Sequence, residues 1–518
     1  MARLTDYTSY ADAQAHFSKE ALWALFDGDR RQLNIACECL DRHPREQIAV
    51  RIAHADGGSE AHGFGALADG AGRFANYLRG RGIGPGERVA IMLEPSYAFY
   101  VALFGAMKAG CVAVPLFTLF GPDGLRLRLD DCDPALLLLA PEKADLGAGA
   151  RVPVAIADDA FLAGLAAAPA GFAADTAADD MAMYQYTSGT TRALPEAVKH
   201  RHRAVVTVMI AALYGTGVRP GDRFMCPSSP AWGHGLWHGT VAPLALGVTI
   251  AAYAGRFEPG RLLRALDEFE ISNLSAAATH YRLMKNSGLA AGRRFALDKL
   301  TFTGEPIDSD TAAWAEATFG GPVRSIYGTT EVGVIIANYP GADDCPVKPG
   351  ALGKPVPGVE LAVRTPDGRS CATDEVGEIM VRRGDAWFPT KDRGHVDADG
   401  YYFHDGRADD VIISAGWTIG AVEVEDVLLT HPDVAETAVI GVADEDRGQV
   451  VKAFVVSSRP GDDGFAAELQ DFVRTRLSAH EYPRRLAFVA SLPKTPAGKV
   501  NRRALRAAEN EKTEQETA

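Results

Sequence analysis

The sequence predicts an α/β protein with a largely parallel sheet, because short apolar runs typical of buried strands alternate with segments of helical spacing. Two further observations set the organisation. The chain has 518 residues, enough for a large core and more than one domain. From about residue 350 the pattern changes to short strands and turns, and beyond Arg407 it returns to α/β. We therefore expect α/β layers, then a small β-rich subdomain, then a C-terminal domain of roughly a hundred residues.

The first round of strands and helices precedes residue 180. Residues 1–45 are expected to form helices packed on the main body. Apolar runs predict strands, one of them entered by a turn, at 48–52, 84–93, 111–115 and 135–140. Helical spacing predicts helices at 64–78, 98–109 and 125–130. Residues 144–178 are rich in Ala, Gly and Asp, which favours a variable surface segment.

The second round and the C-terminal part follow the same logic. Strands are predicted at 181–186, 223–227, 248–253 and 271–277, with helices at 203–213, 237–246 and 262–269. The β-rich part contains short strands at 360–363 and 378–381. The last domain contains helices at 423–429 and 466–477 and strands at 434–442, 452–456 and 486–489. The tail after Leu505 is charged and is expected to fray.

Charge and cysteine usage exclude several classes of function. The net charge of −14 argues against a general nucleic-acid or membrane-surface binder, although local basic residues can still bind a small ligand that carries phosphate. The seven cysteines show neither zinc nor disulfide spacing, which favours a reducing compartment. The first residues lack an apolar signal region, and no apolar stretch is long enough to cross a bilayer. We expect a soluble cytoplasmic protein.

The stretch around residue 187 is the first candidate for chemistry. A predicted buried strand at 181–186 leads into Thr187, Ser188, Gly189, Thr190 and Thr191, and a predicted helix at 203–213 follows. Backbone N–H groups, hydroxyl donors and the positive end of a helix dipole can together cradle phosphate. Thr-Ser-Gly alone would be read as a polar turn, but the whole block is more specific. It is not a Walker loop, because no Gly-Lys-Ser/Thr ending is present.

Two later turns carry a second group of candidates. Gly304, Glu305 and Pro306 follow a predicted strand at 300–302 and alone would be a strand-ending turn. About twenty residues later come Tyr327, Gly328, Thr330 and Glu331. The ring could stack on a base, the hydroxyl could contact phosphate, and Glu331 could hold Mg²⁺ on a triphosphate.

Asp392 and Lys499 complete the candidate set. A carboxylate such as Asp392 can accept both ribose hydroxyls at once, although a charged hairpin is the simpler interpretation. Lys499, beside Gly498, can neutralise a carboxylate and an α-phosphate as they react. Taken alone, a surface lysine is usually only solvated.

Taken together, these motifs resemble the adenylate-forming (AMP-binding) superfamily over about residues 50–505. The resemblance is nearest to medium-chain acyl-CoA synthetases and acetyl-CoA synthetase-like ligases, supported by segments 406–412, 450–456 and 482–485. It implies a large N-terminal domain, residues 1–407, with two α/β subdomains and a small β-barrel. It also implies a small, mobile α+β C-terminal domain, residues 408–518, that carries Lys499.

The resemblance assigns roles by position. It makes Thr187–Thr191 the phosphate loop, Gly304-Glu305-Pro306 the adenine-side turn, and Tyr327, Gly328 and Thr330 with Glu331 the aromatic and Mg²⁺ segment. Asp392 would hold the ribose, and Arg407 would contact ribose or phosphate. Asp409 would be the hinge residue, and Lys499 the adenylation lysine. CoA would enter near Gly416 and Trp417.

The chain departs from the family pattern at three places. Arg192 stands where Gly is usual, and Glu196 stands where Lys is usual, after one added residue. Thr418 stands where family CoA ligases often have Arg. Glu196 is expected to point away from the nucleotide, and Arg192 or Lys199 is expected to replace the missing charge. The opposite interpretation is weakened use of ATP.

The reaction that the resemblance implies has two steps. A carboxylate attacks the α-phosphate of Mg·ATP to give acyl-AMP and pyrophosphate, and the thiol of CoA then displaces AMP. Lys499, Mg²⁺ on Glu331 and the loop that starts at Thr187 would offset charge repulsion in the first step. The second step needs Lys499 moved away, which is the use of a hinge.

The acyl pocket is placed by position only. Trp232, Gly233 and His234 align with the acyl-pocket helix of the family, and residues 276–280, including Ala277, form a second candidate wall. Trp232 would wall the pocket, while Gly233 and Gly235 would leave room for a medium-chain, branched or aromatic acid. A glycine-broken core helix and a packed histidine are equally good readings of these residues.

Two other functions stay open at this point. One is a stand-alone adenylating enzyme that loads a separate carrier protein, and the other is a non-catalytic relative that binds nucleotide or acyl ligand. Arg192, Glu196 and Thr418 motivate the second, and Asp392, Arg407 and Lys499 oppose it. The sequence gives neither the acid nor the pathway. It does not give the oligomeric state either, of which a homodimer is one candidate.

Overall fold

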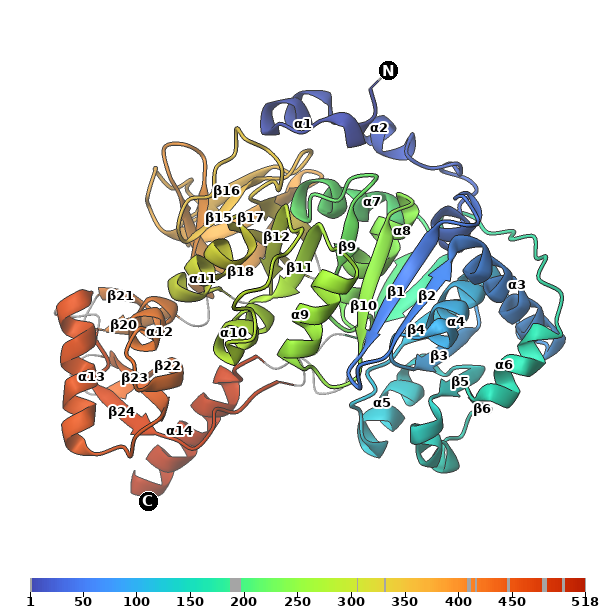
Figure 1. Cartoon of the computed structure of the whole chain (residues 1–518). Helices are drawn as coiled ribbons and strands as arrows, with labels where there is room; N and C mark the ends of the chain where they lie inside the picture. The colour runs from blue at the N-terminus through green and yellow to red at the C-terminus, as the bar shows by residue number, and fades with distance from the viewer. Residues whose placement is uncertain are drawn as a thin grey trace. The chain divides into compact units, whose positions relative to one another are not determined.

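The structure is a computed structural model that describes residues 2–186, 197–304, 306–329, 332–407, 411–414, 417–444, 448–477, 482–495 and 499–517 (Figure 1). The chain divides into two compact units. The first unit comprises residues 1–307, 311–347 and 356–358, and the second comprises 308–310, 348–355 and 359–518. The predicted domain boundary between residues 407 and 408 falls inside the second unit and stays a prediction.

The first unit contains a six-stranded sheet in the order β6-β5-β3-β4-β7-β8. Its strands are parallel except for the last pair, β7 and β8, which is antiparallel. Continuous apolar runs such as Leu136–Leu139 are fully buried, as expected for parallel strands covered on both faces. The strand bounds are β3 Arg88–Met92, β4 Val112–Pro115, β5 Leu136–Leu139, β6 Val154–Ile156, β7 Met181–Gln185 and β8 Val198–Arg201.

A second sheet of the first unit runs in the order β14-β13-β12-β11-β9-β10-β1-β2. It is parallel from β13 to β1 and antiparallel at both ends. This confirms the predicted α/β architecture with a largely parallel sheet. The bounds are β1 Ile48–His54, β2 Ser59–Gly63, β9 Arg223–Met225, β10 Thr249–Ala254, β11 Asn273–Ala277, β12 Lys299–Thr303, β13 Val323–Thr329 and β14 Gly333–Ala337.

Helices of the first unit pack on these sheets through apolar faces. In Figure 1, α9 and α10 lie against the strands β9 to β12, and Leu262, Leu266, Tyr281 and Met284 from these helices share one buried core with Leu274 of β11. The helices are α1 Tyr10–His16, α2 Lys19–Trp23, α3 Phe64–Gly80, α4 Tyr97–Lys108, α5 Pro122–Cys132, α6 Asp159–Ala166, α7 Ala204–Ile210, α8 Ala242–Ala245, α9 Pro259–Glu268, α10 Ala278–Ser287 and α11 Ser309–Phe319.

The second unit contains two β-sheets. The antiparallel strands β16-β17-β18-β19-β15 form the predicted β-rich part, whose closure into a barrel stays a prediction. A second sheet, β21-β20-β23-β22 with β24 beside β23, packs with α12 and α13 around a separate apolar core. The bounds are β15 Ala351–Pro355, β16 Leu361–Arg364, β17 Gly377–Arg383, β18 Ala386–Val396, β19 Tyr402–Arg407, β20 Val411–Ser414, β21 Trp417–Gly420, β22 Val434–Asp444, β23 Gly448–Ser457, β24 Arg485–Phe488, α12 Ala421–Leu429, α13 Asp463–Arg476 and α14 Arg502–Thr517.

Two local predictions are wrong, and one is incomplete. Segment 144–178 is mostly exposed, as predicted, but it also contains strand β6 and helix α6. Residues 325–329 belong to strand β13 rather than to a turn, because they pair with β14. The tail after Leu505 is helical in α14, whose Leu505 is buried and whose Glu509 pairs with Lys452 at 2.5 Å.

A fourth correction concerns the predicted order of strand, loop and helix around residue 187. Strand β8 lies between the loop and helix α7, and it pairs antiparallel with β7. The loop therefore joins the two strands of a hairpin. Helix α7 begins only after β8, so the loop does not lead directly into the positive end of a helix dipole.

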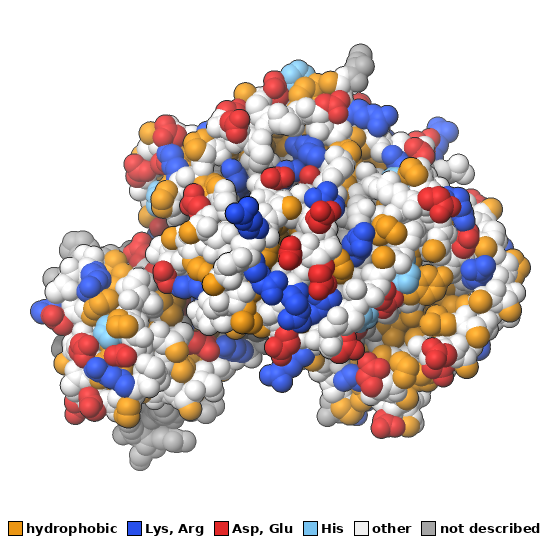
Figure 2. Space-filling model, viewed as in Figure 1, with side chains coloured by type: hydrophobic (Ala, Val, Ile, Leu, Met, Phe, Trp, Pro, Cys, Tyr) orange, Lys and Arg blue, Asp and Glu red, His pale blue; other side chains and the backbone are white. Residues whose placement is uncertain are grey.

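The distribution of charged side chains on the surface and the state of the cysteines agree with what the composition suggests. Basic and acidic side chains lie interspersed on the face seen in Figure 2. All seven cysteines, each within the described ranges, are free thiols. Within those ranges, no helix combines the length and the apolar character that crossing a membrane requires.

Candidate active site

Three of the predicted nucleotide and acyl residues of the first unit lie at one edge of its second sheet. Ala277 ends β11, Gly304 follows β12, and Tyr327 lies near the end of β13. These strands are parallel neighbours, with Ala277 opposite Thr303 and Phe302 opposite Ser325. The Thr303 hydroxyl donates to the Ile326 carbonyl at 2.9 Å and ties two of the strand ends together. Ligands of α/β proteins bind at this carboxyl edge, so the arrangement suits a small-molecule site.

Backbone geometry explains two glycines at this edge. Gly304 has a φ of +92°, in the left-handed region where a Cβ is strained. A Cβ on Gly328 would lie 2.0 Å from the carbonyl oxygen of Gly333 on the paired strand. The ladder also shifts register between Tyr327 and Gly328, an irregularity that is common beside active sites. Pro306 follows the turn, whereas Glu305, Thr330 and Glu331 lie outside the described residues.

His234 is the centre of a buried polar network. It begins a π-helical segment, His234–Val241, and its side chain is 5% exposed. Its Nδ1 lies 3.0 Å from the Ser228 hydroxyl, and its Nε2 lies 2.8 Å from the hydroxyl of Ser275 on β11. Both ring nitrogens are therefore already bonded to protein. Burial lowers the pKa of His234 well below its usual value, so the ring is neutral at pH 7.

The glycines beside His234 are explained by close packing rather than by open space. A Cβ on Gly235 would lie 2.3 Å from the carbonyl oxygens of Ser228 and Ser229. A Cβ on Gly233 would lie 2.7 Å from the side-chain nitrogen of Gln185. The expectation that both glycines leave room is therefore wrong. The places of Trp232, Gly233, His234 and Ala277 in an acyl pocket stay a prediction.

Three further histidines surround this region and are also uncharged. Burial lowers the pKa of His200, His238 and His280 to about 4. The ring of His238 lies 5.7 Å from that of His234, and His280 lies 4.7 Å from Phe257. A cluster of neutral imidazoles offers hydrogen bonds without positive charge. His238 was not predicted from the sequence, although its i+4 spacing from His234 places both on one helical face.

Gln185 lies between the predicted phosphate loop and Trp237, a residue of the candidate acyl-pocket helix. It is the last residue of β7, directly before Tyr186 and the predicted phosphate loop. Its Oε1 accepts a hydrogen bond from the Trp237 indole nitrogen at 2.9 Å, and the Trp237 ring lies 4.8 Å from that of His200. No local pattern predicts a role for Gln185, because it is a single polar residue in an apolar run.

The predicted phosphate loop, Thr187–Thr191, lies outside the described residues together with Arg192 and Glu196. Lys199, the second candidate for the missing charge, lies on β8 opposite Tyr184. Its ammonium is 5.2 Å from the centre of the Tyr184 ring, so it packs along the hairpin.

In the second unit the structure brings Asp392 and Arg407 together. They are direct partners across the antiparallel strands β18 and β19. Asp392 is 5% exposed, its backbone N–H donates to the Thr390 hydroxyl at 3.2 Å, and His404 lies 3.6 Å from its Oδ1. This pairing fits the expectation that the two residues bind one nucleotide, which stays a prediction.

Lys499 lies in an exposed turn of the second unit. Its backbone N–H donates to the Thr495 hydroxyl at 3.3 Å, and its carbonyl accepts from the Thr495 N–H at 2.7 Å. A bridge between Lys494 and Val500 closes the turn. Asp409 and Gly416 lie outside the described residues, and Trp417 begins β21.

Among the described residues, no group of three or more His, Cys, Asp or Glu side chains could hold a metal. Mg²⁺ on ATP needs only one or two carboxylates besides the phosphates and water. The assignment of Glu331 as that carboxylate stays a prediction.

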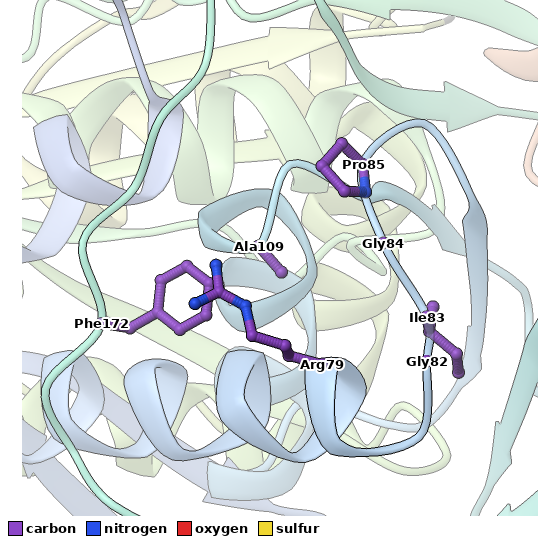
Figure 3. A pocket seen from close by; sticks show the side chains of 7 residues that line it. All are labelled: Arg79, Gly82, Ile83, Gly84, Pro85, Ala109 and Phe172. Atoms are coloured by element: carbon purple, nitrogen blue, oxygen red, sulfur yellow. The ribbon is translucent and has the colours of Figure 1, made fainter.

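A small cavity of about 230 Å³ lies elsewhere in the first unit, between the end of α3 and the turn that enters β3 (Figure 3). The Arg79 guanidinium lies 4.3 Å above the ring of Phe172 on one side, and Gly84 and Pro85 line the other. Because this turn is at the amino end of β3, the cavity is not part of the carboxyl-edge site.

Comparisons with known proteins agree with this arrangement. Residues 38–388 match the AMP-binding enzyme family, and residues 423–499 match the AMP-binding enzyme C-terminal domain. The chain is 29% identical to acetyl-coenzyme A synthetase of Bacillus subtilis (strain 168), over 96% of this chain and 95% of that protein. It is 30% identical to 3-hydroxybenzoate–CoA ligase of Aromatoleum sp. (strain CIB), over 87% and 92%. The crystal structure of Brucella canis acyl-CoA synthetase matches with a TM-score of 0.76 and 31% identity, over 98% of this chain and 100% of that one.

The chain therefore belongs to the AMP-binding enzyme family and is an AMP-forming acid–thiol ligase. Within that family it is close to the acyl-CoA synthetases, which confirms the resemblance inferred from the motifs.

Proposed function

We propose that the protein activates a carboxylic acid with Mg·ATP and transfers the acyl group to CoA. An acid oxygen bonds to the α-phosphorus while the bond to the β-phosphate breaks, giving acyl-AMP and pyrophosphate. The CoA sulfur then bonds to the acyl carbon, its proton passes to solvent, and AMP leaves. The observation that carries this proposal is the shared carboxyl edge at which Ala277, Gly304 and Tyr327 meet.

The charge and position of the candidate residues suggest which part of the nucleotide each would bind. Tyr327 and the turn at Gly304 would hold adenine, and Asp392 with Arg407 would hold ribose, supported by their cross-strand pairing. Lys499 would place a positive charge between two reacting anions, an electrostatic role that suits an exposed lysine. Mg²⁺, when bound, would neutralise part of the triphosphate charge.

We infer that the acid is medium-chain, branched or aromatic and that its tail carries no second carboxylate. His234 and the three histidines around it support this, because His234 is buried, the other three are half-buried, and all four are uncharged at pH 7. A second carboxylate would be desolvated there without a counter-charge, which is costly. A neutral hydroxyl or amine could instead bond to an imidazole, and one relative is named a 3-hydroxybenzoate ligase.

Pyrophosphate release across a panel of acids tests the proposal. The panel contains acetate, a medium-chain acid, a branched acid, benzoate, 3-hydroxybenzoate and malonate, each with and without CoA. We expect release that needs an acid, turnover that needs CoA, and the lowest rate with malonate. Release with an acid but no turnover with CoA would favour a carrier-protein acceptor. No release with any acid would contradict the proposed activity, and the highest rate with malonate would contradict the inferred acid class.

We further propose that the enzyme is cytoplasmic and that Asp409 is a hinge between two half-reactions. The free thiols support the first, and the match of residues 423–499 to a separate C-terminal domain supports the second. The oligomeric state, for which a homodimer is one candidate, can be measured by size-exclusion chromatography with light scattering.

A further inference from the structure

Helix α5 holds both ends of the segment that joins β7 to β8. The segment 187–196 is flanked by Tyr186 and Ala197, which are both described and both buried. The Tyr186 hydroxyl donates to Asp131 Oδ2 at 2.7 Å and lies 2.9 Å from the Arg128 carbonyl oxygen. The Ala197 backbone N–H donates to the same Asp131 oxygen at 3.3 Å. One carboxylate oxygen thus receives a hydrogen bond from each flank.

Apolar packing supports these two hydrogen bonds. Tyr186 and Ala197 share a buried core with Leu125, Leu129 and Cys132 of α5. The Arg128 guanidinium lies 3.7 Å from the Phe120 ring and 5.6 Å from the Tyr186 ring. The phenol is therefore enclosed by α5, and burial together with Asp131 raises its pKa well above the usual value. It stays a donor at every physiological pH.

The position of Asp131 is unfavourable for the helix alone. Asp131 is next to the last residue of α5, and the last turn of that helix contains no basic residue. Carboxylates near a helix C-terminus are repelled by the helix dipole. Asp130 precedes it in the same exposed turn, but it makes no hydrogen bond to either flank among those found in the described residues. The stability of α5 therefore does not explain an aspartate at this position, whereas its hydrogen bonds to Tyr186 and Ala197 do.

We propose that Asp131 is a positioning residue for nucleotide phosphate, because it fixes the separation of Tyr186 and Ala197 at the base of the predicted phosphate loop. This rests on the proposed function, since the resemblance assigns Thr187–Thr191 to phosphate. Fixing both ends of a chain segment before the ligand arrives lowers the entropy lost on binding. Replacement of Asp131 should therefore weaken the binding of ATP rather than the binding of the acid or of CoA.

Four variants test the role of Asp131. Asp131→Ala removes both hydrogen bonds, Tyr186→Phe removes one and keeps the ring, and the double variant tests whether they act together. Asp130→Ala is the matched control, because it removes the same charge one residue away. We expect Asp131→Ala to raise the KM for Mg·ATP about tenfold, the size expected for a lost charge-assisted bond. The KM values for acid and CoA should stay within about twofold, and the double variant should be less than additive.

Amide exchange of a peptide that contains Ala197 is a readout independent of activity. Exchange should be faster in Asp131→Ala than in wild type and unchanged in Asp130→Ala. Equal KM values for the two alanine variants, or a uniform loss in every kinetic constant, would overturn the proposal. If the wild type releases no pyrophosphate with any acid, the proposed function fails. Unchanged amide exchange in Asp131→Ala would refute the proposal that Asp131 fixes Tyr186 and Ala197, whatever the enzymatic activity of the variant.

Discussion

The His234 network and the Lys499 turn are built in opposite ways. His234 is buried, uncharged and bonded at both ring nitrogens, so its position is fixed from two directions. Lys499 is exposed, and its backbone N–H and carbonyl both bond to Thr495. The comparison teaches that residues which shape the candidate pocket are rigidly packed, whereas the residue proposed to act on phosphate is held in a surface turn. The first kind should control stability, and the second should control rate.

Replacement of His234 should give the largest loss of stability. His234→Ala would leave the hydroxyls of Ser228 and Ser275 without their partner and open a cavity, costing about 3 to 4 kcal/mol of unfolding free energy. Urea denaturation of the purified variant measures this. Ser228→Ala should cost less, about 1 to 2 kcal/mol, because one bond is lost. A His234→Ala variant as stable as wild type would mean that the network is not structural.

The two glycines beside His234 should differ in their sensitivity. In Gly235→Ala the new methyl meets backbone carbonyls, which cannot move away, and we expect a loss of about 2 to 3 kcal/mol. In Gly233→Ala it meets the end of the Gln185 side chain, which can turn, so the loss should stay below about 1.5 kcal/mol. Thermal or urea unfolding of both variants checks the order. Equal and small losses would restore the view that these glycines line open space.

Acidification should destabilise the buried histidine region. His202 is fully buried, accepts a hydrogen bond from the Ile35 N–H at 3.1 Å, and has its pKa lowered to about 4 by burial. Because an unfolded histidine binds its proton near pH 6.5, the unfolded state binds more protons between pH 6.5 and 4. Stability is therefore full above about pH 6.5 and falls as the pH drops through that window.

The expected loss between pH 7 and pH 5 is about 2 kcal/mol for each such histidine. Urea titrations at the two pH values measure it. His202→Gln should reduce the pH dependence, while His16→Gln, at an exposed site, should leave it unchanged. Identical stability at both pH values would contradict the assignment of buried neutral rings.

The sequence predicted the sheets well because their strands are apolar runs whose burial decides their structure. It missed α6 because segment 144–178 is dominated by Ala, Gly and Asp, and it missed β8 because Val198–Arg201 is polar and is a strand only through pairing with β7. The meaning of Gly233 and Gly235 could not be predicted, since an open space and a close backbone approach both require glycine. The bond from His234 to Ser275 spans 41 residues and no local pattern reveals it.

The most direct test of the account separates the two half-reactions in Lys499→Ala. Lys494→Ala is the control. Lys494 lies in the same turn, and its replacement removes only a surface ion pair with Glu436. We predict that Lys499→Ala lowers acid-dependent pyrophosphate release about 100-fold or more. The same variant, given synthetic acyl-AMP and CoA, should form thioester at nearly the wild-type rate and unfold like wild type. Full pyrophosphate release in Lys499→Ala, or equal losses in both lysine variants, would contradict the account.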